Sequence, residues 1–167
     1  MTETDLKDHF SRVREGSKEA FAQIYGELKK PVFTVAYRIV RSAVLAEDIT
    51  QDVFVKLFVS PPEPAVKNLR AWIFRMARNL SFDALRKRRT GDVDGVLLTD
   101  ADCADAIVTR MDVERAIGTL PRIEREILSL HLSGGLHFSK VSDIVGLSVP
   151  STYRRYRKAL KALRELL

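Results

Sequence analysis

Apolar residues recur at steps of three and four along most of this chain, and alternation with a period of two never persists. The first spacing places apolar side chains on one face of an α-helix, whereas a half-buried strand requires alternation. The helical spacing fades in residues 90–108, which contain five Asp, two Gly and no basic residue. The sequence therefore predicts an all-α fold of two small helical domains joined by a flexible linker.

The predicted domains are residues 1–89 and 109–167, with residues 90–108 as the linker. Ser17 and Asn68 are expected to cap helices, because their side chains can accept backbone N–H bonds, and Pro31 suits a first helical turn. The first domain is expected to hold helices at about 17–29, 31–41, 45–58 and 69–88. The second is expected to hold helices at about 110–119, at 121–132, up to Val145, and from Ser148 onward.

The net charge of +6 is distributed unevenly. Residues 1–69 balance ten basic against ten acidic side chains, whereas residues 70–89 carry seven basic and one acidic. Residues 153–167 carry six basic side chains and one acidic. Two basic blocks divided by an acidic spacer indicate two contact points on a polyanion such as a nucleic acid.

Other features exclude several classes of protein. The single cysteine, Cys103, rules out an internal disulfide framework and a Cys-rich zinc site, and favours a reducing cytoplasm. No apolar run approaches the roughly 18–20 residues of a membrane span, and the polar N-terminus is unlike a signal peptide. There is no Ser-His-Asp set, glycine-rich phosphate loop or metal-ligand cluster. We therefore expect a binding protein without membrane insertion, not an enzyme, with no cofactor and no metal.

Residues 136–160 have the pattern of a helix-turn-helix. A short amphipathic helix ends at Gly146, Leu147 is expected to be buried in the turn, and Ser148 begins a second helix. One side of that second helix carries an apolar stripe. The other side presents Ser151, Tyr153, Arg154, Arg155, Arg157 and Lys158. A solvated charged helix is the alternative, but such a helix usually mixes both signs, so contact with a DNA major groove is favoured.

The predicted 69–88 helix combines an apolar stripe with basic and aromatic residues. The polar residues of interest are Arg75, Arg78, Asn79 and Arg86. Phe74 and Phe82 lie among them, and such a mixture suits single-stranded nucleic acid, whose bases stack on aromatic rings. Burial of both rings in a helical core is the alternative, and we favour it for the two Phe. Asn79 lowers helix propensity and needs a partner to offset that cost.

The predicted 45–58 helix has an acidic face. Glu47, Asp48, Gln51 and Asp52 lie opposite its apolar stripe. Acids in a first turn stabilise the helix dipole, which accounts for Glu47 and Asp48 but poorly for Asp52. Because such a face would repel phosphates, it is better suited to docking a protein with a basic surface.

Three segments together resemble a known family. AEDITQDVFVKLF is similar to its polymerase-binding region, LRAWIFRMARNLSFDALRKRR to its −10 recognition and melting region, and residues 120–166 to its −35-binding domain. In this order and at this separation they resemble the extracytoplasmic-function (ECF) sigma factors of the sigma-70 family. The resemblance implies that residues 1–89 form sigma region 2 and residues 109–167 form sigma region 4, with its helix-turn-helix.

The resemblance also implies roles and partners. The chain would bind the β′ clamp helices and the β subunit of core RNA polymerase, recognise −35 and −10 promoter DNA, assist melting, and be sequestered by an anti-sigma protein. The implied polymerase-binding residues are Asp48, Gln51, Asp52 and Phe54. Asn79 would capture a flipped −10 base, with Arg75, Arg78 and Arg86 on the nearby backbone. The implied −35 DNA-binding residues are Ser151, Tyr153, Arg154, Arg155, Arg157 and Lys158.

Two other functions fit some of these features. A stand-alone helix-turn-helix regulator would use residues 1–90 for sensing or dimerisation and would bind duplex DNA tightly without polymerase. An adaptor would bind only proteins. Loss of initiation after removal of the cations at the C-terminal helix would separate a sigma factor from the adaptor.

Overall fold

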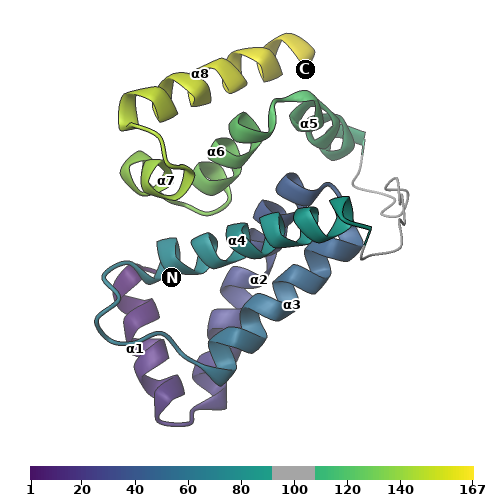
Figure 1. Cartoon of the computed structure of the whole chain (residues 1–167). Coiled ribbons are helices and arrows are strands. Elements are labelled where there is room, and N and C mark those ends of the chain that lie inside the picture. Colours follow the sequence, from purple (N-terminus) through teal and green to yellow (C-terminus); the bar gives the residue numbers. More distant parts are fainter. Residues whose placement is uncertain (92–107) are drawn as a thin grey trace.

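In a computed structural model of the chain, which describes residues 1–91 and 108–167, the regular elements are all α-helices (Figure 1). The described helices are α1 (Glu3–Arg14), α2 (Lys18–Val40), α3 (Ala43–Val59), α4 (Leu69–Arg89), α5 (Val108–Thr119), α6 (Arg122–Leu132), α7 (Phe138–Val145) and α8 (Val149–Leu166). The all-α prediction is confirmed. The predicted linker falls almost entirely on residues 92–107, outside the described residues.

Short polar side chains begin most of these helices. The residues whose side-chain oxygens accept a backbone N–H at the starts of α2, α3, α4 and α8 are Ser17, Ser42, Asn68 and Ser148. At α1, Thr2 and Asp5 form a capping box. Hydrogen bonds from the backbone and side chain of Thr2 lower the pKa of Asp5. The predicted caps at α2, α4 and α8 are confirmed.

One sequence prediction about the first helices was wrong, and one helix was missed. Pro31 does not begin a new helix, because α2 runs through it without a break. A proline inside a helix costs about 3 kcal/mol, and burial of Leu28, Val32 and Val35 of α2 in the main core offsets this cost. Helix α1 was not predicted, although its buried Leu6, Phe10 and Val13 follow helical spacing.

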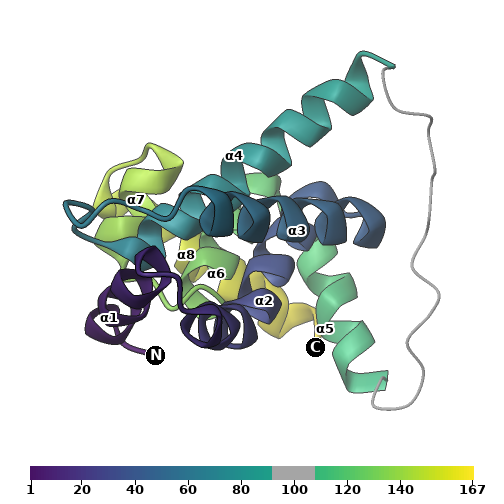
Figure 2. The same cartoon turned by 90° about the horizontal axis from the view of Figure 1, so that it is seen from below.

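Helix α2 is the centre of the first group of helices. It packs against α1, α3 and α4, as the two cartoon views show (Figures 1 and 2). The C-terminal end of α4 projects beyond the other helices of this group (Figure 2). This projection leaves the basic residues of the last turns of α4 largely exposed.

Helices α5–α8 pack onto the first group instead of standing apart from it. Helix α6 contacts α2, and α7 contacts α4 (Figure 1). The main apolar core of α1–α4 continues into Ile127, Leu130, Leu136, Val141 and Ile144. A second, smaller core lies within α5, α6 and α8. The two groups of helices thus share one continuous apolar core.

Polar contacts reinforce this junction. Arg38 of α2, 8% exposed, forms an ion pair with Glu114 of α5 at 2.7 Å. Arg125 of α6 donates to the carbonyl of Arg38 at 3.0 Å, and Arg70 of α4 donates to the carbonyl of Gly134 at 3.2 Å. The junction therefore combines buried apolar surface with specific hydrogen bonds.

Replacing either of two glycines by alanine should change the stability of the chain, but in opposite directions. A Cβ on Gly134, after α6, would lie 2.5 Å from the carbonyl oxygen of Leu130, whereas a Cβ on Gly26, within α2, would meet nothing within 4 Å. We expect Gly134→Ala to lower the free energy of unfolding by about 1–3 kcal/mol. Gly26→Ala should raise it by about 0.5–1 kcal/mol, because Ala costs less entropy in a helix. Urea denaturation measures both, and equal effects would contradict the assigned geometry.

Candidate nucleic-acid interface

The helix-turn-helix consists of α7 and α8. Gly146 ends α7 with a positive φ of 73°, and its N–H donates to the carbonyl of Ser142 at 2.9 Å. A non-glycine side chain would be strained at this φ. Leu147 is half-buried against the main core, which fixes the turn, and Ser148 caps α8. The predicted helix boundaries at this turn are therefore confirmed.

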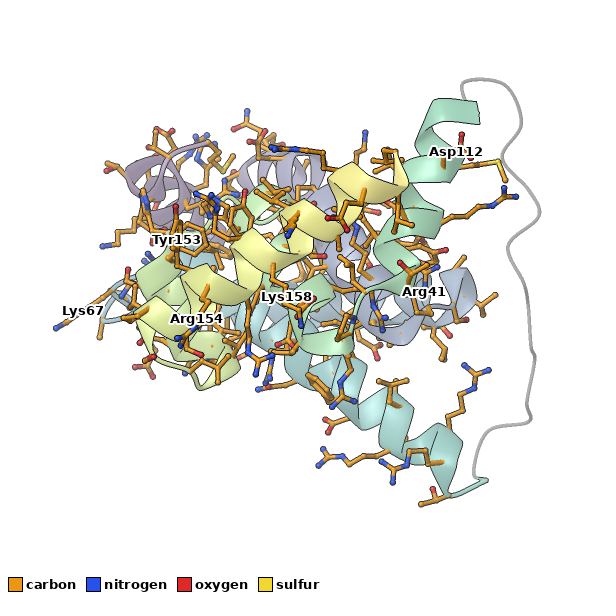
Figure 3. All side chains as sticks on the ribbon, turned by 90° about the horizontal axis from the view of Figure 1, so that it is seen from above. Arg41, Lys67, Asp112, Tyr153, Arg154 and Lys158 are labelled. Carbon is orange, nitrogen blue, oxygen red and sulfur yellow. The ribbon has the colours of Figure 1, made fainter. Side chains whose placement is uncertain are left out.

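Helix α8 separates an apolar side from a basic side. Thr152, Ala159 and Leu163 are buried, whereas Val149, in the first turn, is 46% exposed. The predicted DNA-contacting residues that are exposed are Tyr153, Arg154, Arg155, Arg157 and Lys158, and Ser151 is half-buried. Figure 3 shows Tyr153, Arg154 and Lys158 along α8, away from the junction with α2. The structure thus brings this predicted set together on one helix.

The cations of α8 differ in their partners. Arg154 and Arg155 pair with no other described residue. Lys158 lies 3.4 Å from the carboxylate of Glu124, which is 2% exposed. Arg157 donates to the hydroxyl of Tyr153 at 3.4 Å. Lys158 therefore has a structural role that its position in the sequence did not reveal.

An aromatic cluster holds α8 against α6 and α7. The His131 ring stacks on the Phe138 ring, with their centroids 4.2 Å apart, and meets the Tyr156 ring edge-on at a centroid distance of 5.1 Å. Phe138 also meets Tyr153 edge-on at 5.3 Å. The Nδ1–H of His131 donates to the carbonyl of Leu136 at 2.8 Å. His131 is thus a structural residue that orients the exposed face of α8.

The predicted −10 residues lie along α4 in different environments. Arg75 and Asn79 are exposed, and neither has a partner among the described residues. Arg86 is exposed and pairs with Asp83 one turn away. Arg78 is half-buried and pairs with Glu126 of α6. Asn79 therefore lacks, among the described residues, the partner that would offset its cost to helix propensity.

The two phenylalanines of α4 have different environments. Phe74 is fully buried, which confirms its predicted place in the core. Phe82 is only half-buried, and the guanidinium carbons of Arg78 and Arg122 lie 4.6 and 4.8 Å from its ring centroid. A groove here is lined by Arg78, Asn79, Phe82, Asp83, Arg86, Arg122, Ile123 and Glu126. Arg122 and Glu126 were not predicted at this site, because they come from α6 and not from α4.

Glu126 is buried, with 1% of its side chain exposed. Burial raises the pKa of its carboxyl, and the hydrogen bond and charge of Arg78, with the charge of Arg122, only partly oppose this. In the folded chain this carboxyl therefore holds its proton to a higher pH than in the unfolded chain. The stability that it contributes when protonated is lost as the pH rises through the folded pKa.

The raised pKa of Glu126 predicts how the stability of Glu126→Gln, whose side-chain amide cannot ionise, will depend on pH. The stability of this variant relative to the parent should increase as the pH rises from the ordinary carboxyl value of 4.5 through the raised pKa. Thermal unfolding from about pH 4 to pH 8 measures the difference. Glu15→Gln, on the exposed end of α1, should show no such trend. A Glu126→Gln variant that loses relative stability with rising pH would contradict the assignment.

Three of the four residues predicted on the acidic face of α3 are exposed, and the fourth, Glu47, is half-buried, with its carboxylate 3.8 Å from the ammonium of Lys29. Asp48, Gln51 and Asp52 are exposed, and none has a partner among the described residues. Phe54 is only 4% exposed, and its ring meets Tyr25 edge-on at 4.8 Å. Phe54 therefore lies in the core and not on the surface with the other three.

Exposed apolar residues extend this acidic face. Val55 is 58% exposed and Phe58 is 52% exposed. Val55 follows Asp48 by seven residues, which on a helix puts both on one side. The spacing from Asp48 was the signal that could have identified Val55 in the sequence. An acidic surface with adjacent apolar side chains is typical of a protein-docking site.

The described residues carry neither a metal cluster nor a membrane span. Within residues 1–91 and 108–167, no three His, Cys, Asp or Glu side chains are placed to hold a metal ion. In the same ranges, no helix has both the length and the apolar character needed to cross a membrane.

Comparisons with known proteins agree with this arrangement. A family profile described as sigma-70 region 2 matches residues 24–90, from α2 to the end of α4. The chain is 27% identical over 176 residues to the ECF RNA polymerase sigma factor SigK of Mycobacterium tuberculosis (strain ATCC 25618 / H37Rv), covering 98% of this chain and 94% of SigK. It is 23% identical over 180 residues to the ECF RNA polymerase sigma factor SigW of Bacillus subtilis (strain 168), covering 97% of this chain and 96% of SigW.

Solved structures show the same fold. The sigma factor RpoE in complex with the anti-sigma factor NepR, from Bartonella quintana, superposes with a TM-score of 0.71 at 25% identity, covering 87% of this chain and 95% of RpoE. CnrH in complex with the cytosolic domain of CnrY superposes with a TM-score of 0.70 at 22% identity, covering 97% of this chain and 96% of CnrH.

Proposed function

The chain belongs to the extracytoplasmic-function class of the sigma-70 family, and we propose that it binds core RNA polymerase, directs it to promoters with −35 and −10 elements, and assists melting. One observation carries this proposal. A single chain presents two separate surfaces with unpartnered polar side chains, Arg154 and Arg155 on α8 and Arg75 and Asn79 on α4. Two such surfaces suit two elements of one DNA molecule.

Each surface has a chemistry suited to its element. On α8, Arg154 and Arg155 contact phosphates, while Ser151, Tyr153, Arg157 and Lys158 face −35 bases in the major groove. On α4, Asn79 captures an unpaired −10 base, with Arg75, Arg78 and Arg86 near the backbone. Extruding that base costs a few kcal/mol, and adjacent cations offset part of this cost. The chain supplies binding energy and no reaction step.

The acidic face of α3 is the proposed polymerase contact. Asp48, Gln51 and Asp52 would meet the β′ clamp helices, and the β subunit would contact the chain elsewhere. Since Phe54 is buried, its role is to support α3 from within. We further propose that the chain acts in the cytoplasm with the polymerase. It would be held there by an anti-sigma protein, as RpoE is bound to NepR and CnrH to the cytosolic domain of CnrY in their complexes.

The proposed −35 contact predicts the behaviour of the double variant Arg154→Ala/Arg157→Ala. Initiation by the reconstituted holoenzyme at a promoter with an intact −35 element should fall about 10–100-fold, because two DNA contacts are lost. Binding to core polymerase should be unchanged. Run-off transcription and a polymerase pull-down measure the two quantities.

The matched control is Lys7→Ala/Arg12→Ala on α1, which removes the same charge from exposed positions. It should initiate like the parent. Unchanged initiation by the α8 double variant would favour the adaptor function instead. Lys158 is left intact because its removal would leave the buried Glu124 carboxylate unpaired.

A further inference from the structure

Glu124 of α6 carries a buried carboxylate beneath helix α8. Its side chain is 2% exposed, and its carboxylate lies 3.4 Å from the ammonium of Lys158, whose own side chain is 73% exposed. Within residues 1–91 and 108–167, this is the one ion pair that Glu124 forms. A surface lysine of α8 is thus tethered from below by an acid that lies out of reach of a ligand on the surface.

The start of α6 explains why this carboxylate is available to α8. Glu124 is the third residue of α6, a position from which an acid commonly accepts the backbone N–H of the N-cap residue. Here the N-cap residue is Pro121, which has no N–H to donate. An acid in the first turn also stabilises the helix dipole, but an exposed acid would do so without the cost of burial. The pairing with Lys158 therefore calls for a separate explanation.

Lys158 differs from the other cations of α8 in its partner. Arg154 and Arg155 are exposed and pair with no other described residue, which leaves them free to follow phosphates. Arg157 donates to the hydroxyl of Tyr153. Of the cations of α8, Lys158 alone is paired with a carboxylate among the described residues. Figure 3 shows it about one turn beyond Arg154 on the same helix.

The tether matters because a lysine side chain is long and flexible. Holding a free ammonium at one point costs conformational entropy, and beside a duplex it pairs most readily with phosphates, which carry no sequence information. An ammonium already held by Glu124 has lost this entropy on folding and keeps its remaining N–H groups for another acceptor. In the major groove guanine offers two acceptors, O6 and N7, whereas cytosine offers a donor.

Resting on the proposed function, we propose that Glu124 is a positioning residue for promoter recognition. Without touching DNA, it fixes the Lys158 ammonium so that this lysine selects guanine at one base pair of the −35 element. Its negative charge also offsets that of Lys158, so that the lysine adds little to the binding of unrelated DNA. Glu124 thus lowers general affinity and raises sequence selectivity.

The first measurement is binding of the full chain to duplex DNA of unrelated sequence, because the basic side of α8 is exposed in this structure. A fluorescein-labelled duplex of about 20 base pairs is titrated by anisotropy at several salt concentrations. Glu124→Gln nearly preserves the shape of the side chain and frees Lys158, so it should bind about two- to threefold more tightly than the parent. The slope of log affinity against log salt should steepen by about 0.9, the value for one added phosphate contact.

The second measurement is the selectivity of the reconstituted holoenzyme among duplexes that differ from its −35 element at a single base pair. The parent should prefer guanine at the position that Lys158 contacts. Glu124→Gln should lower this preference about 3–10-fold and leave the preferences at the other positions unchanged. A variant that is merely less stable would weaken binding at every position alike, so this pattern separates positioning from a structural role.

Further variants supply the controls. Adding Glu124→Gln to Lys158→Gln should change selectivity no further, because no ammonium remains to be positioned. Glu124→Asp keeps the charge but withdraws it by one methylene, and should show a smaller loss in the same direction. Glu165→Gln removes an exposed acid of α8 that pairs with no described cation, and should keep the salt slope and selectivity of the parent. Circular dichroism confirms that each variant is folded.

The proposal is overturned if Glu124→Gln keeps the parent preference at every −35 position, or if it binds unrelated DNA no more tightly than Glu165→Gln. A parent holoenzyme that selects its −35 element while Glu124→Gln behaves identically refutes only the positioning role. A parent holoenzyme without a preference at any −35 position refutes the proposed function itself.

Discussion

The double variant Asp48→Arg/Asp52→Arg should bind core RNA polymerase at least about 100-fold more weakly than the parent chain. Charge pairs across an interface contribute about 1.5 kcal/mol or more each, so the loss of two corresponds to about this factor. Both carboxylates are exposed and have no partner among the described residues, so the chain should fold normally. Equilibrium binding to labelled core enzyme measures the effect.

The control for this variant is Asp8→Arg/Glu15→Arg, which makes the same charge change on exposed positions of α1. It should retain the parent affinity at equal ionic strength. If the α3 variant binds as tightly as this control, the acidic face of α3 is not the docking surface. A loss that disappears at high salt would still be consistent with it, because screening weakens charge contacts in the parent as well.

A second large effect is expected from a cavity in the apolar core that the two groups of helices share. Leu130 of α6 is fully buried in the cluster that also contains the core of α1–α4. Leu130→Ala should lower the free energy of unfolding by about 2–5 kcal/mol and the melting temperature by about 10 °C. Because the core is shared, the α1–α4 helices should melt at this lower temperature too.

Trp72 provides a local readout of this effect. It is the single tryptophan of the chain and packs against the main core from α4. Its fluorescence transition should shift with the circular dichroism transition in Leu130→Ala. Leu132→Ala, at an exposed position of the same helix, should leave both unchanged. A Trp72 transition that stays in place while the circular dichroism transition splits would show that the two groups unfold independently.

Local features of the fold were predictable from the sequence because local physics determines them. Ser17, Asn68 and Ser148 cap helices through bonds to residues three positions away. The exposed side of α8 follows from helical spacing alone. The effect of Pro31 was misjudged because its cost is offset by the burial of α2 side chains against other helices, which the local sequence does not show.

The errors at the candidate site have a non-local origin. The family resemblance implied Phe54 as a polymerase contact, but Phe54 is buried because Phe21 and Tyr25 of α2 cover it. Likewise, the pairing of Arg78 with Glu126 joins residues 48 positions apart. The sequence located the basic residues of α4 but not the helix that packs on them.

Initiation by purified core RNA polymerase provides the decisive experiment for a sigma factor role. Fragmented genomic DNA of the host is transcribed with and without the chain, and the 5′ ends of the transcripts are mapped. Addition of the chain should create start sites that share two upstream elements near −35 and −10. Identical start sites with and without the chain, together with tight binding of the chain alone to duplex DNA, would contradict that role and favour a stand-alone regulator.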